Sequence, residues 1–197
     1  MHSGWGVVVA LDERHVVLER QRIQLVEDDI PGGRQPYHHA RDIGMHKAES
    51  FLSEYTARCE RSAKAEIERI ISALEPRGYR VTAGGLVLAS ARVLPSLPQI
   101  LSAHLLIHTS EGQLFRDVIR HACEAAAIPL LGIAEKQLAA SFEECFGKEA
   151  GGIKQMIQKS GKSLGPPWNS DHKQAAIVGC LALQQFAKQV HAKRSGA

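Results

Sequence analysis

The apolar positions between residues 98 and 127 recur every three or four residues, which predicts one amphipathic helix. The stripe consists of Ile100, Ile107, Leu114, Phe115, Val118 and Ala122. Three polar residues interrupt it: His104, His108 and Glu111, spaced four and then three positions apart. At about 100° per residue, Glu111 falls within the stripe and the histidines flank it, so all three side chains are expected to point inward. Buried polar groups need partners, so the pattern predicts an internal hydrogen-bond network or a functional site.

A second interpretation of the same segment stays open. Thr109 and Ser110, followed by Gln113, resemble the start of a helix, which would make residues 103–108 a short strand. Strand alternation would then place both histidines on one face. The two interpretations agree that the histidines share a side, and the unbroken apolar stripe favours the helix.

The N-terminal part of the chain predicts strands followed by a loop. Residues 5–11 and 16–26 are rich in Val, Ile and Leu and flank a short polar turn, so they predict a β-hairpin. Residues 28–41 contain several Pro and Gly residues and predict an irregular loop. The end of that loop is Pro36, Tyr37, His38 and His39.

The rest of the chain alternates helical and strand patterns. Residues 45–74 predict one long amphipathic helix, and residues 79–90 predict a buried central strand. Residues 128–134 predict another strand after the histidine helix, which implies a parallel crossover. The remaining expected elements are short helices at 135–146 and 153–159, a loop at 161–170, and a last helix at 171–191 capped by Asn169 or Ser170. The expected fold class is therefore α/β.

The composition is ordinary for a globular protein of 197 residues, with 44% hydrophobic and 23% charged content. One domain covering residues 1–197 is expected, with a flexible tail from about residue 193. A net charge of +3 and a pI near 8.7 are compatible with nucleic acid or another phosphorylated partner but do not require one. Four widely spaced cysteines without a CxxC pair are expected to be reduced small hydrophobes.

Membrane and export signals are not evident in the sequence. No run approaches the roughly 20 apolar residues that cross a membrane, and the first residues do not resemble a signal peptide. We therefore expect a cytoplasmic protein without a membrane partner. The apolar edges of the predicted hairpin are compatible with a homo-oligomer.

Two motifs and the order of expected elements resemble one superfamily. The first motif is a Gly-aromatic-Gly-Val entry into a strand, Gly4-Trp5-Gly6-Val7-Val8. The second is an acidic residue before an Ala- and Leu-rich run, Asp171-His172-Lys173-Gln174-Ala175-Ala176 and then Leu181-Ala182-Leu183-Gln184. Both are similar to the ribonuclease H-like superfamily, in particular to its branch of Holliday-junction resolvases and pre-rRNA processing nucleases. The resemblance implies a mixed β-sheet flanked by helices, with the first strand lacking or truncated, and nuclease activity.

Nucleases of that fold hold two metal ions between several carboxylates, and this chain departs from that set. The first carboxylate belongs on a strand before Gly4, where only three residues stand. The second belongs at the end of the central strand, which here has Ala89 and Ser90. Asp171 matches a remaining position, with Glu111 as a relocated ligand. Either the true start lies upstream, or a divergent member uses its histidines differently.

The first functional hypothesis is a nuclease or phosphodiester hydrolase with its site at the carboxyl edge of the sheet. Its expected catalytic residues are His104, His108, Glu111 and Asp171. Its expected substrate-binding residues are His38, His39, Lys173 and Trp168. Such a set either binds one metal ion or acts as a metal-free general acid and base. The expected ligands of a divalent Mg, Mn or Zn ion are Glu111 and Asp171.

Each substrate-binding candidate also has a plainer interpretation. Lys173, in the first turn of the last helix, either meets a phosphate drawn to that helix N-terminus or is simply solvated. Adjacent histidines in a Gly/Pro-rich loop are often only exposed. Trp168 is either a base-stacking platform or a packing anchor for the last helix.

The second hypothesis is a non-catalytic scaffold that binds nucleic acid or protein and has a degenerate active site. The incomplete carboxylate set is the sign expected of it. Truncating His108 and Glu111 separately distinguishes the two hypotheses. A structural network predicts a loss of about 1–3 kcal/mol from each truncation, whereas a functional cleft predicts near-neutral or stabilising effects.

Overall fold

The computed structural model describes residues 1–27, 29–89 and 93–195, with side chains described as far as residue 187. The chain forms two compact units. Unit 1 comprises Met1–Gly6, Ile23–Ile70 and Ala91–Ala126, and unit 2 comprises Val7–Arg22, Ile71–Ser90 and Ala127–Ala197. Helices and strands both contribute, which confirms the α/β class. The single ribonuclease H-like domain expected from the sequence stays a prediction.

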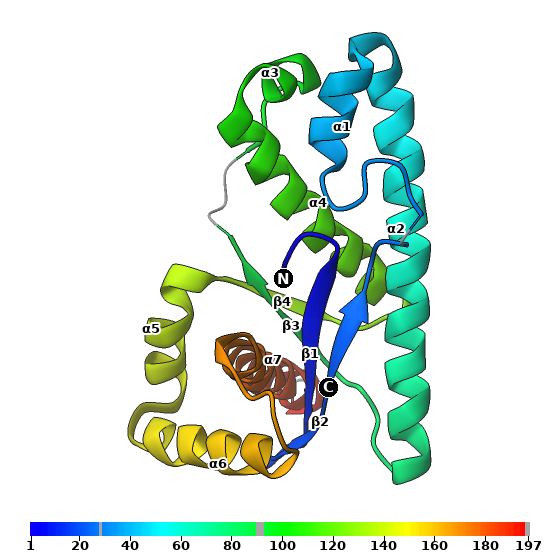
Figure 1. The fold of residues 1–197 in the computed structure, drawn as a ribbon. Helices are drawn as coiled ribbons and strands as arrows, with labels where there is room; N and C mark the ends of the chain where they lie inside the picture. Colours follow the sequence, from blue (N-terminus) through cyan, green and yellow to red (C-terminus); the bar gives the residue numbers. More distant parts are fainter. Residues whose placement is uncertain (28, 90–92, 196–197) are drawn as a thin grey trace. The chain divides into compact units, whose positions relative to one another are not determined.

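Unit 1 is mainly helical. Its helices are α1 (Pro36–Ile43), α2 (Met45–Leu74, which continues into unit 2), α3 (Leu97–Ser102) and α4 (His104–Ala125). Helices α1, α3 and α4 contact one another, and Figure 1 shows them grouped together. A small core of Ala40, Ala48, Leu52 and Leu101 joins α1, α2 and α3.

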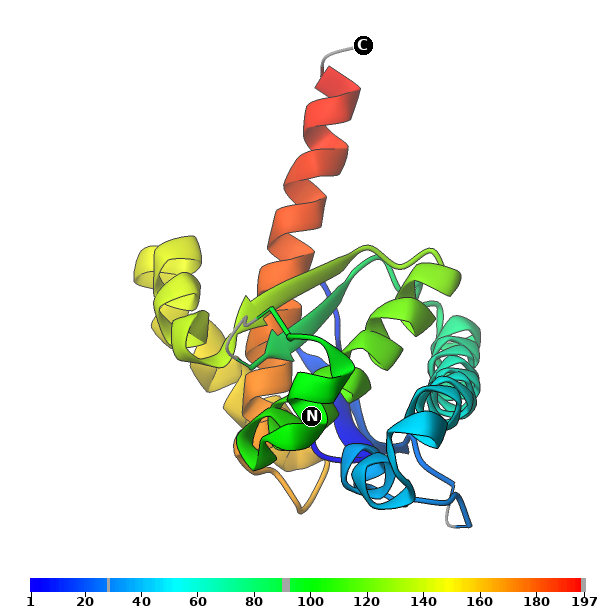
Figure 2. The ribbon, with the colours of Figure 1, turned by 90° about the horizontal axis from the view of Figure 1, so that it is seen from above.

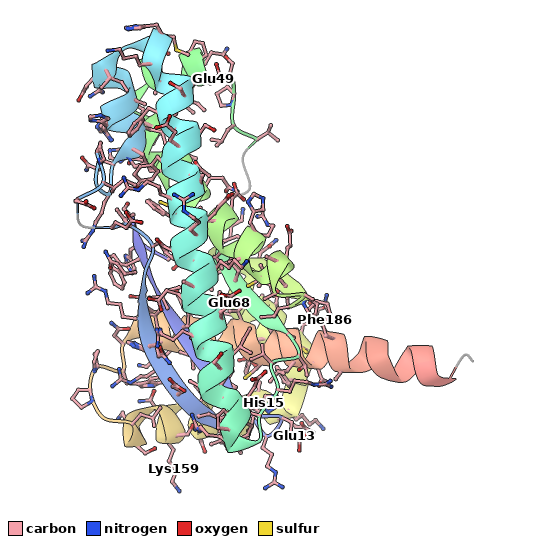
Figure 3. The ribbon with its side chains drawn as sticks, turned by 90° about the vertical axis from the view of Figure 1, so that its right-hand side faces the viewer. Glu13, His15, Glu49, Glu68, Lys159 and Phe186 are labelled. Atoms are coloured by element: carbon pink, nitrogen blue, oxygen red, sulfur yellow. The ribbon has the colours of Figure 1, made fainter. Side chains whose placement is uncertain are left out.

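Helix α2 has the bounds that the apolar spacing predicts. Its buried stripe is Leu52, Tyr55, Cys59, Ala63, Ile67, Ile70 and Leu74. Exposed carboxylates such as Glu49 and Glu68 lie along its length (Figure 3). The helix ends in a 3-10 turn, η1 (Glu75–Arg77), and Gly78 adopts the left-handed conformation that favours glycine at such an end.

The expected loop at 28–41 was wrong at its C-terminal end, because α1 begins at Pro36. Proline is well suited to the first position of a helix, where its fixed φ helps and its missing N–H is not needed. The buried Ala40 anchors this short helix. His38 and His39 are therefore helical residues, and the helix sets the directions of their side chains. Asp28 lies outside the described residues.

The expected single helix at 98–127 is two helices. Ala103 is extended, with φ −131° and ψ 115°, and separates α3 from α4. At the start of α3, the Ser96 N–H donates to Gln99 Oε1 at 3.1 Å, the side-chain half of a capping box. The rival prediction of a strand at 103–108 was also wrong, because His104 and the residues after it are helical.

Unit 2 contains most of the predicted hairpin, β1 (Trp5–Leu11) and β2 (Val17–Gln24). Asp12 closes the turn between them. Its Oδ1 accepts hydrogen bonds from the N–H groups of Arg14 at 3.0 Å and Val16 at 2.8 Å. This use of a short polar side chain is typical of turn residues, and it confirms the hairpin that the sequence predicts.

A second sheet in unit 2 pairs β3 (Gly84–Leu88) with β4 (Leu130–Ala134) in parallel, with Gly84 opposite Leu130. The parallel crossover is confirmed. Strand β3 is shorter than the strand expected at 79–90. Within the described residues β3 pairs with β4 alone, so its expected central position in a sheet was wrong. The sheets have two strands each and are separate, whereas the resemblance implies one mixed sheet.

Two helices pack against the parallel pair in unit 2, α5 (Glu135–Phe146) and α7 (Ser170–Ser195). Helix α6 (Ala150–Ser163), reached through the 3-10 turn η2 (Gly147–Glu149), packs on α5 and α7. Helix α7 packs on β3 and β4, and its C-terminal part runs on past both strands (Figure 2). The approach is closest at Gly85, where an added Cβ would lie 2.5 Å from the Val178 carbonyl oxygen. Only glycine permits this contact.

The core of unit 2 draws on the hairpin, α5, α6 and α7. Its buried members are Val17, Leu138, Phe142, Ala150, Ile153, Ile157, Ala176, Val178, Cys180 and Leu181. Helix α6 is longer than the expected 153–159, because Ala150 and Gly161 extend its buried face in both directions.

Polar contacts hold the segment before α7. The Arg20 guanidinium Nη2 donates to the carbonyls of Gly165 at 3.0 Å and Pro166 at 2.7 Å. Asn169 Oδ1 lies 3.4 Å from the His172 N–H, so the expected Asn169 cap is present. Burial lowers the pKa of His172, with Arg20 acting in the same direction and Asp171 opposing.

The cysteines are free, as the sequence predicts. Burial raises the pKa of Cys59 and Cys123 to about 11 and that of Cys180 to about 12. These thiols are therefore weak nucleophiles at neutral pH. Among the described residues, no helix combines the length and the apolar character needed to span a membrane.

Candidate functional site

Three histidines and one glutamate gather in unit 1. His38 comes from the first turn of α1, and His104, His108 and Glu111 come from the first two turns of α4. The helix break at Ala103 starts α4 at His104, so this histidine stands at the very beginning of the helix. The spacing of four and then three residues places the three α4 side chains on one side of the helix.

Glu111 is the buried member of the group, with its side chain only 3% exposed. Its Oε1 lies 2.9 Å from His38 Nδ1 and 3.4 Å from the His38 backbone N–H. Its Oε2 lies 3.7 Å from His108 Nδ1. Because His38 is in the first turn of α1, the carboxylate also meets the positive end of that helix. A buried carboxylate needs such partners, and most of them come from His38.

The imidazoles contact one another in front of Glu111. His104 Nε2 and His108 Nε2 are 3.2 Å apart. The His38 ring centroid lies 5.4 Å from that of His104 and 4.8 Å from that of His108. One nitrogen from each ring can be chosen so that all three atoms lie within 4.8 Å of one another. The three rings therefore converge on one small volume.

The expectation that all three α4 side chains point inward holds for Glu111 and was wrong for the histidines. His104 and His108 are exposed, and the His108 side chain retains 49% of its accessible surface. Helical periodicity gives the direction of a side chain, but it does not say whether another element covers it. The outcome is a buried carboxylate beneath exposed imidazoles.

The charge of Glu111 contributes to a raised pKa of two tyrosines. Burial raises the pKa of Tyr37, and the Asp117 and Glu111 carboxylates raise it further. Burial is also the main cause that raises the pKa of Tyr55, whose hydroxyl donates to the Gly33 carbonyl at 2.5 Å. Both phenols therefore stay neutral at ordinary pH, and neither is a base in this site.

Three of the other expected site residues, Asp171, Lys173 and Trp168, belong to unit 2. Lys173 is exposed, and the Trp168 ring covers Gly161 and donates through Nε1 to Gln158 Oε1 at 3.2 Å. These contacts are those of a packing anchor.

His39, in unit 1, packs against Phe51 with ring centroids 4.7 Å apart. Its neighbour His38 faces Glu111 and the other two histidines instead. Adjacent residues on a helix point about 100° apart, which accounts for the different surroundings of the two rings. Of the two histidines, His38 is the one that joins the cluster.

The two-metal centre of ribonuclease H-like nucleases does not fit these residues. Ala89, at the place of one expected carboxylate, offers no ligand atom, and Ser90 lies outside the described residues. Glu111 directs both oxygens toward histidine Nδ1 atoms. A set of imidazoles also differs from the oxygen ligands that Mg²⁺ prefers.

Comparison with known proteins adds no relative. The chain matches no protein-family model, and neither a curated protein nor a solved structure shows significant similarity to it.

The different burial of Glu111 and His108 predicts different costs of truncation. Glu111→Ala should lower the free energy of unfolding by about 1–3 kcal/mol, because it strands His38 Nδ1 and the His38 N–H. His108→Ala should change it by less than about 0.5 kcal/mol, since that side chain is half exposed. Urea denaturation followed by circular dichroism measures both. Equal losses of unfolding free energy from the two substitutions would contradict a supporting role for the buried Glu111 beneath an exposed His108.

Proposed function

We propose that this chain is a hydrolase of phosphodiester bonds, with nucleic acid as its substrate class and the cluster of His38, His104, His108 and Glu111 as its reactive centre. The observation that carries the proposal is the buried Glu111 carboxylate, 2.9 Å from Nδ1 of His38, beneath two exposed imidazoles. Exposed imidazoles are accessible to a substrate. A buried carboxylate behind them is the usual support for a reactive histidine.

The arrangement supports the activation of water. When the His38 Nδ1–H donates to Glu111, the lone pair of that ring is on Nε2, away from the carboxylate. In hydrolysis the water oxygen attacks phosphorus, one P–O ester bond breaks, and a proton passes from the water to the leaving oxygen. The products are a phosphomonoester and an alcohol. Imidazoles promote the proton transfers of such a step by factors of roughly 10² to 10⁴.

The net charge and the order of the elements support the choice of substrate class. The net charge of +3 favours an anionic partner, and phosphodiesters of nucleic acid are anions. The order of hairpin, long helix, strand, helix, strand and closing helices agrees with the ribonuclease H-like resemblance. The separate two-stranded sheets and the missing carboxylates make this a divergent version of that fold within the proposal.

The test is hydrolysis of bis(p-nitrophenyl) phosphate and of labelled single- and double-stranded oligonucleotides by the full chain. His108→Ala should reduce the rate about 100-fold while the protein stays folded, because it removes one exposed imidazole. His46→Ala is the matched control, since His46 is an exposed histidine of α2 that no cluster contact includes. Equal rates for the parent and His108→Ala would overturn the proposed centre.

The incomplete carboxylate set favours one competing function, a scaffold that binds nucleic acid or protein without turnover. The same oligonucleotides distinguish it. Saturable binding in an electrophoretic shift, with no cleavage by the parent protein, would support the scaffold and reject the hydrolase.

A further inference from the structure

The nitrogens of His38, His104 and His108 lie slightly farther apart than the ligands of one bound metal ion, within 4.8 Å of one another. Zinc binds histidine nitrogen at about 2.0–2.1 Å in a tetrahedron, which places ligand nitrogens about 3.4 Å from one another. His104 Nε2 and His108 Nε2 are already 3.2 Å apart, and one nitrogen from each of the three rings can be chosen so that all lie within 4.8 Å of one another. Small rotations of the two exposed rings would close the remaining gap.

Glu111 sits where metal centres place the carboxylate that orients their histidines. Both of its oxygens face Nδ1 atoms, of His38 at 2.9 Å and of His108 at 3.7 Å. That arrangement leaves Nε2 of both rings as the ligand atoms. Ligating histidines commonly donate their other N–H to a carboxylate, which fixes the tautomer and strengthens the ligand. Glu111 is therefore a positioning residue and not a ligand.

We infer that His38, His104 and His108 bind one transition-metal ion of the zinc type through their ring nitrogens, with Glu111 behind them and a fourth position open to solvent. Three imidazoles without a ligating carboxylate favour zinc, copper, iron or nickel over magnesium or calcium. Three protein ligands and one open position are typical of catalytic zinc rather than structural zinc. The exposure of His104 and His108 provides the opening.

The charge balance agrees with the substrate class. Three neutral imidazoles, one divalent cation and the Glu111 carboxylate leave one positive charge at the surface of unit 1. That charge attracts a phosphodiester anion and polarises a bound water. With a metal bound, the imidazole lone pairs would hold it and would not be free for proton transfer, so the metal would replace them in activating water. The inference deepens the proposed function by naming its cofactor class, and in this respect it rests on that proposal. Binding of the metal is measurable without any turnover.

The first experiment is a titration of the full chain with Zn²⁺ in competition with a chromogenic chelator. The parent protein should bind one equivalent. His104→Ala and His108→Ala, which change exposed side chains and should fold, are each expected to weaken binding by more than 100-fold. His39→Ala is the matched control, because His39 adjoins His38 in sequence but packs on Phe51. It should retain one equivalent at the parent affinity.

The role of Glu111 has its own readout. Glu111→Gln keeps the shape of the side chain and is expected to weaken zinc binding by roughly 10- to 100-fold with stoichiometry unchanged. Co²⁺ in place of zinc should give the intense visible bands of a four-coordinate site in the parent protein. A parent affinity in Glu111→Gln would overturn the positioning role, and a six-coordinate cobalt spectrum would overturn the three-histidine site.

Different results would overturn the metal site and the proposed hydrolase activity. No stoichiometric zinc binding, or equal weakening by His39→Ala and His104→Ala, would overturn the metal site. Hydrolysis that resists chelators would also reject the metal while the hydrolase stands. Zinc bound with the expected variant pattern, but without phosphodiester hydrolysis, would support the metal site and reject the hydrolase.

Discussion

Replacing Phe115 by Ala is expected to lower the free energy of unfolding by about 3–5 kcal/mol, among the largest losses for a single substitution in unit 1. Phe115 is fully buried on α4, one turn after Glu111, and its ring lies 6.5 Å from that of Tyr55 on α2. The truncation removes this contact between the two helices and leaves a cavity in the core of unit 1. Guanidinium denaturation followed by circular dichroism measures the loss.

The matched control is Leu105→Ala on the same helix. Leu105 is 68% exposed, so its truncation should change the free energy of unfolding by less than about 0.5 kcal/mol. Phe115→Leu should fall between the two, because it keeps much of the buried volume. If Phe115→Ala cost no more than Leu105→Ala, the packing of α4 on α2 would be refuted.

Gly85→Ala is expected to destabilise unit 2 by about 3 kcal/mol, the upper part of the range for overpacked cores. The added Cβ would lie 2.5 Å from the Val178 carbonyl oxygen, 2.7 Å from its carbon and 3.0 Å from the Gly179 nitrogen. These are backbone atoms of α7, so rotation of a side chain cannot relieve the overlap. Thermal unfolding by differential scanning calorimetry should show the loss as a lower midpoint.

A glycine in an open part of the same unit provides the opposite expectation. An added Cβ at Gly151 in α6 meets nothing within 4 Å, so Gly151→Ala should raise stability by roughly 0.5–1 kcal/mol through helix propensity. Opposite signs for the two substitutions separate a steric effect from a general effect of losing glycine. A neutral Gly85→Ala would mean that α7 does not approach β3 as closely as described.

Long periodic helices were predictable from the sequence because many residues carry the same signal. The bounds of α2 (Met45–Leu74) and α5 (Glu135–Phe146) agree with the spacing of their apolar residues. Two shorter features were not predictable. The sequence predicts a loop through Pro36, although proline also begins helices. Ala103 favours helix by propensity, and no Gly or Pro near it signals the break.

The candidate site was predictable only in part. Glu111 stands out because it is a charge within an apolar stripe, and the structure places it among the buried residues. Its main partner, His38, lies 73 positions away in the chain, and no local pattern connects the two. Their contact depends on where tertiary packing places α1, which short-range reasoning does not reach. The chemical role of the cluster stays a prediction until binding and turnover are measured.

The interleaving of the two units has a consequence for how the protein is made. The segment Ala91–Ala126 of unit 1 lies between β3 and β4 of unit 2, and the hairpin strands also pass from one unit to the other. No single cut of the chain therefore releases either unit intact. During synthesis, β3 cannot pair with β4 until all of α4 has been made, because α4 precedes β4 in the chain. His38, His104 and His108 have therefore all been synthesised before the parallel strands pair. Completion of the histidine cluster can thus precede completion of the sheet.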